Sequence, residues 1–545
     1  MRNCRNKLLA FFLCLCASGV AMAQEAVYLI PPVHLLPLKK METNAYGLDV
    51  PGESDVLNQD VWKNASYSVT AAKFEQIPDR LPAEAERLRL ALAKLAAEPP
   101  QGTADQAFIT LKLQLLFNRA QFDDAYKLLQ KVPEKVRSDS QKKIYADILL
   151  TRNLQTACFL KETDGDDPFW QELAAVCAAS AKEENKAFLA LDLLKEQEQA
   201  SPFLTNAVEL FLYGKPLTTQ PEEITPLTVA VWRACGRSLS DLKHPDKSVW
   251  FQALFARDET IPVEKRLKTA EILVQNGILP SSNLRTYYQQ VSFERYKNKT
   301  LPPEITRAQY IQQAAGLSSR STDNLKKQSF LKKGLQSAKS SRVSYAFSSA
   351  AKDILETIKP DPETLGESAE MIEAFVLSGL NDQALDWSQK AEILFPVSET
   401  TADGWYFAEL AETDKNRHFF IPTLENVMAY AEKKKAADNA FIAKTDRLML
   451  AFQMLDMIQP DETWRYTSFA EGSQEEEASE RKKQLKPHEK PVGDTVLEAL
   501  RELNGTYAGL LNALSLLSGA GMDREAALLT AQSADLILHP DKAHE

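Results

Sequence analysis

Apolar residues recur at three- and four-residue spacing along most of the chain after Pro82. Examples are Leu88, Leu92 and Leu95 in one run and Met371 and Phe375 in another. The runs are about 12 to 20 residues long, and short polar breaks rich in Pro and Gly separate them. No stretch alternates apolar and polar residues between hairpin turns, as strands would. The pattern predicts an all-α protein of roughly 20 helices.

The regular alternation of helix and short turn predicts how these helices are arranged. Helical hairpins that cannot bury their apolar faces alone stack on their neighbours, so we expect an α-solenoid or superhelix of antiparallel hairpins over residues 81–470. The chain has only 19 Gly among 545 residues. Tight turns need Gly at positive φ, so this scarcity argues against an all-β fold or a large parallel α/β enzyme.

One segment carries a recognisable repeat pattern. Met371 and Phe375 fall on one face of a first helix, Ala384 and Ala391 lie seven residues apart on a second, and Pro396 follows five residues later. This hairpin resembles the tetratricopeptide repeat, and the general plan is similar to the superhelical non-catalytic part of soluble lytic transglycosylases. The resemblance implies that these five residues form a repeat core. An ordinary helical hairpin would give the same pattern, and three positions depart from the family's preferences: Ser368, Ile372 and Ser388.

The first 23 residues have the features of a secretory signal. Three basic residues precede an apolar run from Leu8 to Val20, and Ala21-Met22-Ala23 follows. The run would span only ~20 Å as a helix, against a hydrocarbon core of ~30 Å, which disfavours a membrane anchor. We therefore expect cleavage after Ala23 and a periplasmic protein. No later stretch is long and apolar enough for a transmembrane segment in the mature chain.

The remaining boundaries follow from changes in composition. Residues 24–80 contain Pro31-Pro32 and predict an extended arm, followed by a short helix near Tyr67–Glu75. Residues 471–493 are charged and nearly free of apolar side chains, which predicts a disordered loop. Residues 494–545 should form capping helices. A structural oligomer in which the arm enters a neighbouring subunit is an alternative that leaves the oligomeric state open.

The signal removes three of the six cysteines and leaves Cys158, Cys177 and Cys235. Export to an oxidising compartment makes a disulfide plausible. Cys158 ends one apolar helical stretch and Cys177 lies in the next, so neighbouring antiparallel helices would bring them within reach. Cys235 would then be a free, buried thiol, although a pairing that involves it stays open. No C-x-x-C motif suggests redox chemistry.

Motifs that carry catalytic or metal chemistry are missing from the sequence. The six histidines show no metal-ligand spacing, and no nucleotide-binding or nucleophile motif occurs. We therefore predict no metal, no cofactor and no catalytic residue, and we expect that the protein is not an enzyme. The alternative is a cell-wall or polysaccharide-acting enzyme, or its regulatory subunit, with an unrecognised pair of carboxylates.

The charge balance narrows the class of partner. The formal net charge is −11, so the footprint of nucleic-acid binding is missing. The acidic balance favours a basic protein partner. Together these features predict an exported helical-repeat scaffold that mediates protein–protein interaction in the cell envelope, in envelope assembly, cell-wall or motility machinery. One stretch, from Lys326 to Arg342, is locally basic although the chain as a whole is acidic. We expect it to form a solvent-exposed helical face.

Overall fold

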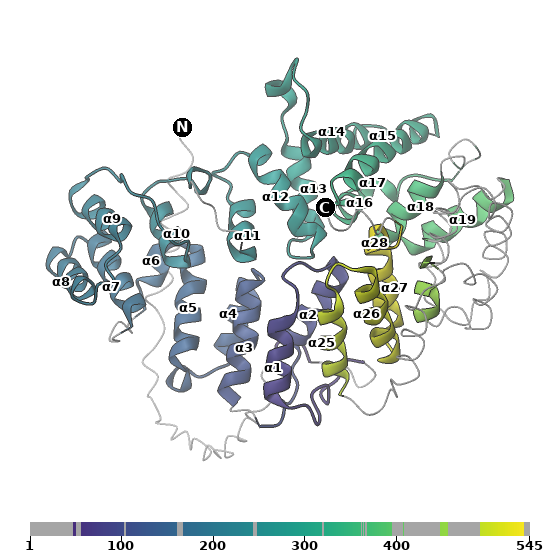
Figure 1. The fold of residues 1–545 in the computed structure, drawn as a ribbon. Coiled ribbons are helices and arrows are strands. Elements are labelled where there is room, and N and C mark those ends of the chain that lie inside the picture. The colour runs from purple at the N-terminus through teal and green to yellow at the C-terminus, as the bar shows by residue number, and fades with distance from the viewer. Residues whose placement is uncertain are drawn as a thin grey trace, which may run out of the picture. The chain divides into compact units, whose positions relative to one another are not determined.

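A computed structural model describes residues 47–50, 56–102, 105–160, 167–242, 248–318, 321–360, 362, 365, 368–394, 407, 447–448, 450–455 and 491–538. These residues form 23 α-helices and three short 3-10 helices, and no β-strand occurs among them (Figure 1). The predicted all-α fold class is confirmed. Within the same ranges, no helix has both the length and the apolar composition needed to cross a membrane. The predicted signal peptide, 1–23, lies outside the described residues.

The helices are numbered along the chain. Those of the first half are α1 (Tyr67–Gln76), α2 (Ala83–Lys94), α3 (Asp105–Asn118), α4 (Phe122–Gln130), α5 (Asp139–Arg152), α6 (Leu154–Ala157), α7 (Pro168–Ser180), α8 (Glu184–Glu196), α9 (Pro202–Tyr213), α10 (Pro226–Ala234), α11 (Val249–Arg257) and α12 (Val263–Gln275). Those of the second half are α13 (Ser281–Gln290), α14 (Pro303–Ala315), α15 (Ser321–Ser340), α16 (Ser344–Ala350), α17 (Lys352–Leu355), α18 (Ser368–Leu377), α19 (Asn381–Leu394), α25 (Val492–Glu502), α26 (Tyr507–Gly519), α27 (Asp523–Gln532) and α28 (Ala534–Leu538).

Local signals fix where several of these helices begin and end. Ser138 and Gln141 form a capping box at the start of α5, in which each side chain accepts a hydrogen bond from the other residue's backbone N–H. Asp167 caps α7 through the N–H of Phe169 at 2.9 Å, with Pro at the first helical position. Helix α9 ends where Gly214 takes the left-handed conformation, φ 72°. These local capping residues therefore determine the ends of α5, α7 and α9, three helices that line the candidate site described below.

Helices that follow one another in the chain pack as pairs, which is compatible with a helical repeat architecture. This holds for α7 with α8, α11 with α12, α14 with α15, α18 with α19 and α25 with α26. In the α18–α19 hairpin, the predicted repeat-core residues Met371, Phe375, Ala384 and Ala391 are all buried. The Phe375 ring lies 5.3 Å from that of Trp387 across the hairpin. The fifth predicted core residue, Pro396, lies outside the described residues.

The C-terminal helices pack against the beginning of the chain. Helix α25 contacts α1 and α2, and α27 contacts α2 and α18 (Figure 1). The backbone N–H of Gly493 donates to the carbonyl of Val61 at 3.0 Å, and a Cβ at this position would lie 2.7 Å from the Trp62 ring. Only glycine permits this approach. Contacts across more than 400 residues add to the nearest-neighbour contacts that a linear repeat array has.

The described part of the predicted arm packs into the main core. Val61, Trp62 and Phe74 are buried, and α1 matches the short helix expected near Tyr67–Glu75. Thr70 donates a hydrogen bond to Asp494 of α25 at 3.1 Å. Residues 24–46 lie outside the described residues, as do 456–490, which hold most of the predicted charged loop. Helix α25 begins at Val492, inside the predicted boundary of that loop at 493.

The lysines of α15 are not a purely exposed face, contrary to the expectation. Lys327 is buried and donates to the Thr357 hydroxyl at 3.1 Å. Lys332 pairs with Glu370 of α18 at 3.4 Å, and Lys339 pairs with Glu373 of the same helix. The local sequence around α15 gives no indication of the carboxylates that α18 brings opposite it.

One buried ionic network joins four consecutive helices. Arg307 of α14 is 2% exposed, and its guanidinium binds both carboxylate oxygens of Glu271 of α12, at 2.8 and 2.5 Å. The hydroxyl of Tyr288 on α13 donates to the same carboxylate at 2.7 Å. Arg307 also donates hydrogen bonds to the hydroxyl of Ser337 on α15 and to that of Ser341, directly after this helix. Burial raises the pKa of Glu271 even though these donors oppose the shift.

Candidate functional site

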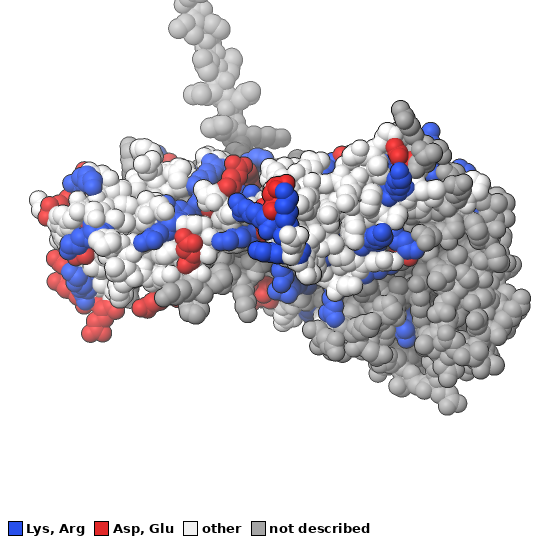
Figure 2. Space-filling view, turned by 90° about the horizontal axis from the view of Figure 1, so that it is seen from above, with Lys and Arg blue, Asp and Glu red and all other residues white. Residues whose placement is uncertain are grey.

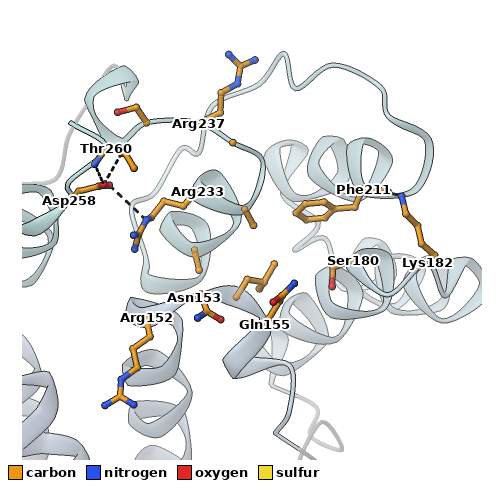
Figure 3. Close-up of a pocket in the computed structure, with 15 residues that line it drawn as sticks. Arg152, Asn153, Gln155, Ser180, Lys182, Phe211, Arg233, Arg237, Asp258 and Thr260 are labelled. Carbon is orange, nitrogen blue, oxygen red and sulfur yellow. Dashed lines mark hydrogen bonds and ion pairs between the residues drawn. The ribbon is translucent and has the colours of Figure 1, made fainter. Parts of the chain in front are cut away.

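A cleft of about 670 Å³ lies between α5–α6, the α7–α8 turn, α9, α10 and the loop from α11 to α12 (Figure 3). Five separate elements supply its walls, so it forms only when the helices pack. We call it the basic cleft because four of its lining side chains are cationic and one is anionic. Its lining residues are Arg152, Asn153, Leu154, Gln155, Ser180, Lys182, Phe211, Ala230, Arg233, Ala234, Gly236, Arg237, Ser238, Asp258 and Thr260.

Two of the four cations in the basic cleft are paired with carboxylates. Arg152 binds Asp123 of α4 at 3.1 Å, and Figure 3 shows its guanidinium directed away from the middle of the cleft. Arg233 points from α10 toward the buried carboxylate of Asp258, at 3.8 Å. That carboxylate also accepts hydrogen bonds from the N–H and the hydroxyl of Thr260, at 3.0 and 2.7 Å. Thr260 therefore fixes the counter-ion of Arg233.

The other two cations contact backbone carbonyls. Arg237 donates to the carbonyl of Leu217 at 3.1 Å, and Lys182 donates to that of Phe211. Neither has a carboxylate within ion-pair distance in the part of the chain that the structure describes. Both side chains belong to exposed residues. Figure 3 shows the Arg237 guanidinium directed away from the middle of the cleft, so the positive charge of these two residues lies at the rim, where a ligand that carries carboxylates can meet it.

The local charge of this surface differs from the charge of the whole chain. The net charge is −11. Figure 2 shows a face on which Lys and Arg gather over the middle, in the stretch where α10 to α12 lie in Figure 1, with fewer Asp and Glu among them. Net charge governs long-range attraction, whereas a cleft responds to the charges that line it. The basic cleft thus favours an acidic ligand, although the composition favours a basic partner.

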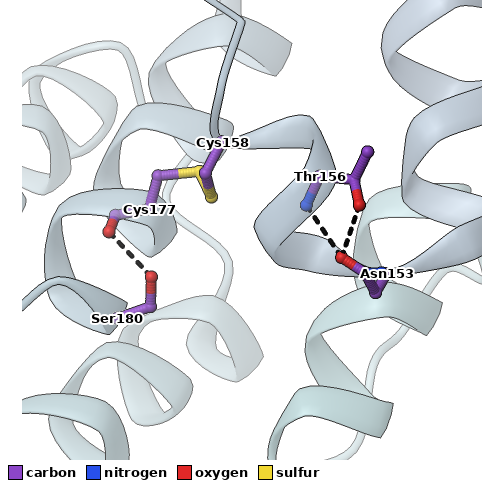
Figure 4. The surroundings of a disulfide bond; sticks show 5 residues. All are labelled: Asn153, Thr156, Cys158, Cys177 and Ser180. Carbon is purple, nitrogen blue, oxygen red and sulfur yellow. Dashed lines mark hydrogen bonds between the residues drawn. A yellow bond between two sulfur atoms is a disulfide. The ribbon is translucent and has the colours of Figure 1, made fainter. Parts of the chain in front are cut away.

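Uncharged groups in the basic cleft suit a polypeptide. Apolar contact area comes from Phe211, Leu154 and the alanines of α10, while Asn153, Gln155 and Ser180 offer hydrogen-bonding groups. The Asn153 side-chain oxygen is engaged in the cap of α6, where it accepts from the N–H and the hydroxyl of Thr156, both at 2.8 Å (Figure 4). Gln155, the second residue of α6, makes no side-chain hydrogen bond within the described part of the chain.

A disulfide holds two walls of the basic cleft together. Cys158, directly after α6, and Cys177, on α7, are bonded with their Cα atoms 5.4 Å apart (Figure 4). This is the pair of cysteines that the sequence predicts to lie on neighbouring antiparallel helices. Ser180, three residues after Cys177, donates to the Cys177 carbonyl at 2.8 Å and lines the cleft. The bond therefore connects the elements that carry Gln155 and Ser180, and it is compatible with export to an oxidising compartment.

Cys235 is a free thiol at the C-terminal end of α10, between two residues that line the basic cleft. It is half-buried, not fully buried as expected. Burial raises the pKa of its thiol to about 11, with Arg237 opposing the shift. At neutral pH the thiol therefore stays protonated and is a poor nucleophile.

Two carboxyl groups outside the basic cleft have strongly raised pKa values. Burial raises the pKa of Asp147 on α5 and of Glu172 on α7 to about 7 each, and Lys143 opposes both shifts. Lys143 itself lies 5.0 Å above the ring of Phe169 on α7. Carboxyl groups that hold a proton near neutral pH are suited to general acid catalysis. Burial alone also raises the pKa of a carboxyl group in this way. The raised pKa values therefore do not by themselves indicate a catalytic role.

No group of three or more His, Cys, Asp and Glu is placed to hold a metal ion within the described residues. All six histidines, at positions 34, 244, 418, 488, 539 and 544, lie outside them. The predictions that the chain has no metal site and no cofactor stay predictions.

Sequence reasoning missed the basic cleft. Arg152, Lys182, Arg233 and Arg237 are spread over 86 positions of an acidic chain, and each one alone looks like an ordinary surface cation. The one signal in the sequence is the closeness of Arg233 and Arg237, of which Arg233 lies in the last turn of α10 and Arg237 in the loop that follows. The remaining cations come together only through helix packing.

A comparison of this chain with known protein families, curated proteins and solved structures finds no match. The resemblance to the tetratricopeptide repeat and to the transglycosylase superhelix therefore rests on the residues of the 368–396 hairpin. The structure supports the coarser statement that the chain is all-helical, with neighbouring helices packed as pairs.

Proposed function

We propose that this chain is a periplasmic helical-hairpin scaffold that binds an acidic segment of a protein partner in the basic cleft. The observation that carries the proposal is the pair Lys182 and Arg237, two exposed cations at the rim of a cleft of about 670 Å³ that have no carboxylate partner among the described residues. A cleft of this size holds a few residues of polypeptide. Arginine in particular forms paired hydrogen bonds with carboxylates.

Three further features support binding rather than catalysis. The lining contains both apolar and amide side chains, which match a peptide's side chains and backbone. The disulfide fixes two walls, so the site is preorganised before the partner arrives. The one acidic lining residue, Asp258, is occupied by Arg233 and Thr260, which leaves it poorly placed as a general base. The predicted signal peptide and the disulfide both support a location outside the cytoplasm.

Charge reversal at the rim tests the proposal. In fluorescence anisotropy with a labelled Glu-rich decapeptide, the double variant K182E/R237E should bind at least tenfold more weakly than the wild-type mature chain. Both residues are exposed, so the variant should fold. The matched control, K186E/K195E, makes the same change of net charge on α8, at exposed lysines that do not line the basic cleft.

The partner itself can be captured from the cleft. A photo-crosslinking amino acid at Gln155 should yield crosslinks in periplasm-containing cells, and these should disappear in K182E/R237E but persist in the control pair. Equal weakening by both pairs of substitutions would show a general charge effect and would overturn the proposal. Displacement of the peptide by an oligonucleotide at equal concentration would instead favour a nucleic-acid ligand.

The second candidate function, a cell-wall enzyme, has one observation in its favour. Asp147 on α5 and Glu172 on α7 both have raised pKa values, and both lie within the electrostatic influence of Lys143, whose Nζ lies over the ring of Phe169. Hydrolysis of purified peptidoglycan by the mature chain, lost in D147N and in E172Q, would establish this activity. No hydrolysis at any pH from 5 to 8 would exclude this pair as the catalytic one.

A further inference from the structure

A second hollow, of about 590 Å³, lies beside the basic cleft and is formed by α11, α12, α13 and the loop between α11 and α12. We call it the Arg266 pocket. The loop separates the two, because Asp258 and Thr260 line the basic cleft whereas Glu259 lines the Arg266 pocket. The pocket's other lining groups include Arg257 and Asn283.

Arg266 of α12 is buried, and no carboxylate of the described residues lies within ion-pair distance of it. Arg266 is 5% exposed. Its Nη1 donates a hydrogen bond to the carbonyl of Ala256 at 3.1 Å, and its guanidinium lies 4.9 Å from the centre of the Tyr287 ring. Its Nε is buried and has no hydrogen-bond partner. A buried charge without a counter-ion is costly to fold, because the lost hydration is not replaced.

The other buried arginines show that this is unusual for the protein. Arg307 is bound to Glu271, and Arg119 and Arg89 both lie against Glu86, at 2.9 and 3.6 Å. Among the arginines that the structure describes as buried, Arg266 is therefore the one without a carboxylate within ion-pair distance. It is also the one that lines a hollow of this size.

The second cation of the pocket adds to the positive charge. Arg257 of α11 is half-buried, and its Nη1 donates to the carbonyl of Ala120 at 3.3 Å, so it too contacts a backbone oxygen. Glu259 is the one acidic lining residue, and it is exposed at the rim. The hydroxyl and amide groups of Ser282, Thr286 and Asn283 supply neutral hydrogen-bonding groups.

We propose that the Arg266 pocket binds a small, doubly charged oxyanion, which supplies the counter-ion that the fold leaves out. Two guanidinium groups match two negative charges, and guanidinium groups bind oxyanions through charge-assisted hydrogen bonds. A phosphate and a dicarboxylate share this chemistry. The site is separate from the basic cleft and does not depend on the scaffold proposal.

Calorimetric titration of the wild-type mature chain tests the site. Sodium phosphate and sodium succinate are used as probes at constant ionic strength, with sodium chloride as the reference. We expect saturable binding of one ion per chain and a rise in unfolding temperature with concentration. Phosphate binding alone would identify a phosphate site, and succinate binding alone a dicarboxylate site. No saturable binding of either up to about 10 mM, which corresponds to less than ~3 kcal/mol, would overturn the proposal.

Variants separate the pocket from general surface charge. R266K keeps the charge but loses the paired donors, and should bind the probe at least tenfold more weakly. E259Q removes the repelling carboxylate at an exposed position and should bind about threefold more tightly. The matched control E294Q removes an exposed carboxylate outside the pocket and should change nothing.

If R266K fails to fold, two variants keep the test decisive. N283L fills the pocket from a half-buried position without changing charge, and should abolish binding. E259Q should still increase it. Equal effects of E259Q and E294Q, or unchanged binding in N283L, would refute the site. None of these substitutions touches the basic cleft, so the two proposals can fail independently.

Discussion

Removing the Cys158–Cys177 disulfide should loosen α6 and α7 by a predictable amount. The bond joins residues 19 positions apart in sequence. Cross-linking a loop of this length lowers the entropy of the unfolded segment and stabilises the folded one by about 3 kcal/mol. Both cysteines are half-buried against the core, so replacing them with serine adds little further cost. The double variant C158S/C177S should therefore lose about 3 kcal/mol of local stability.

Hydrogen exchange measures this loss where it occurs. A chain of this size need not unfold in a single step, so a global midpoint would mix several transitions. Backbone amides of α6 and α7 should exchange about 100-fold faster in C158S/C177S, because each 1.4 kcal/mol corresponds to a factor of ten. Amides of α14 and α15 serve as the internal control and should not change. C235S is the matched variant and should leave α6 and α7 as protected as in the wild type.

Two outcomes would refute this reasoning. One is unchanged exchange in α6 and α7 after the double substitution, which would mean that packing alone holds these helices. The other is a count of three free thiols in unfolded protein that was purified from an oxidising compartment, where we expect one. Reduction of the wild-type protein should reproduce the exchange pattern of the double variant.

Three further predictions follow from buried groups. R307M leaves the Glu271 carboxylate buried with Tyr288 as its remaining donor, and should cost about 3–5 kcal/mol by chemical denaturation, whereas E271M/R307M should recover most of that. Asp147 and Glu172 have pKa values raised to about 7 from ordinary values of 3.8 and 4.5. The unfolded chain ionises first, so stability should fall as pH rises from about 4 to 7, and D147N/E172Q should flatten this unfolding-temperature profile. Cys235, with its pKa raised to about 11, should react with iodoacetamide at pH 8 far more slowly than the thiol of the amino acid cysteine in solution; an equal rate would contradict its burial.

The elements that sequence predicted correctly are those whose signals are local. The short helix expected near Tyr67–Glu75 is α1, Tyr67–Gln76, and the hairpin built on Met371, Phe375, Ala384 and Ala391 is α18–α19 with those residues buried. Apolar spacing, caps and helix-breaking Gly or Pro act within one or two helical turns. They therefore determine helices and the turns between them without knowledge of the rest of the fold.

Contacts between distant parts of the chain could not be predicted in this way. The approach of Gly493 to Trp62 depends on α25 meeting α1, more than 400 residues away. The lysines of α15 were expected to face solvent because their carboxylate partners lie on α18. The basic cleft is the same case, since its four cations come from different elements and the net charge has the opposite sign. The local pattern of a single sequence does not indicate which distant helices come into contact.

The disulfide makes the proposed binding activity of the basic cleft depend on the redox state of the chain. Helix α6 has four residues, too few to be stable alone, and its position depends on the Asn153 cap at one end and on Cys158 at the other. It carries Gln155, and α7 across the bond carries Ser180, so reduction frees two walls of the site from each other. A loosened wall must be ordered when a ligand binds, which weakens affinity. In the anisotropy assay, we therefore expect the oxidised chain to bind the peptide more tightly than the reduced chain does, and equal affinities would contradict this link.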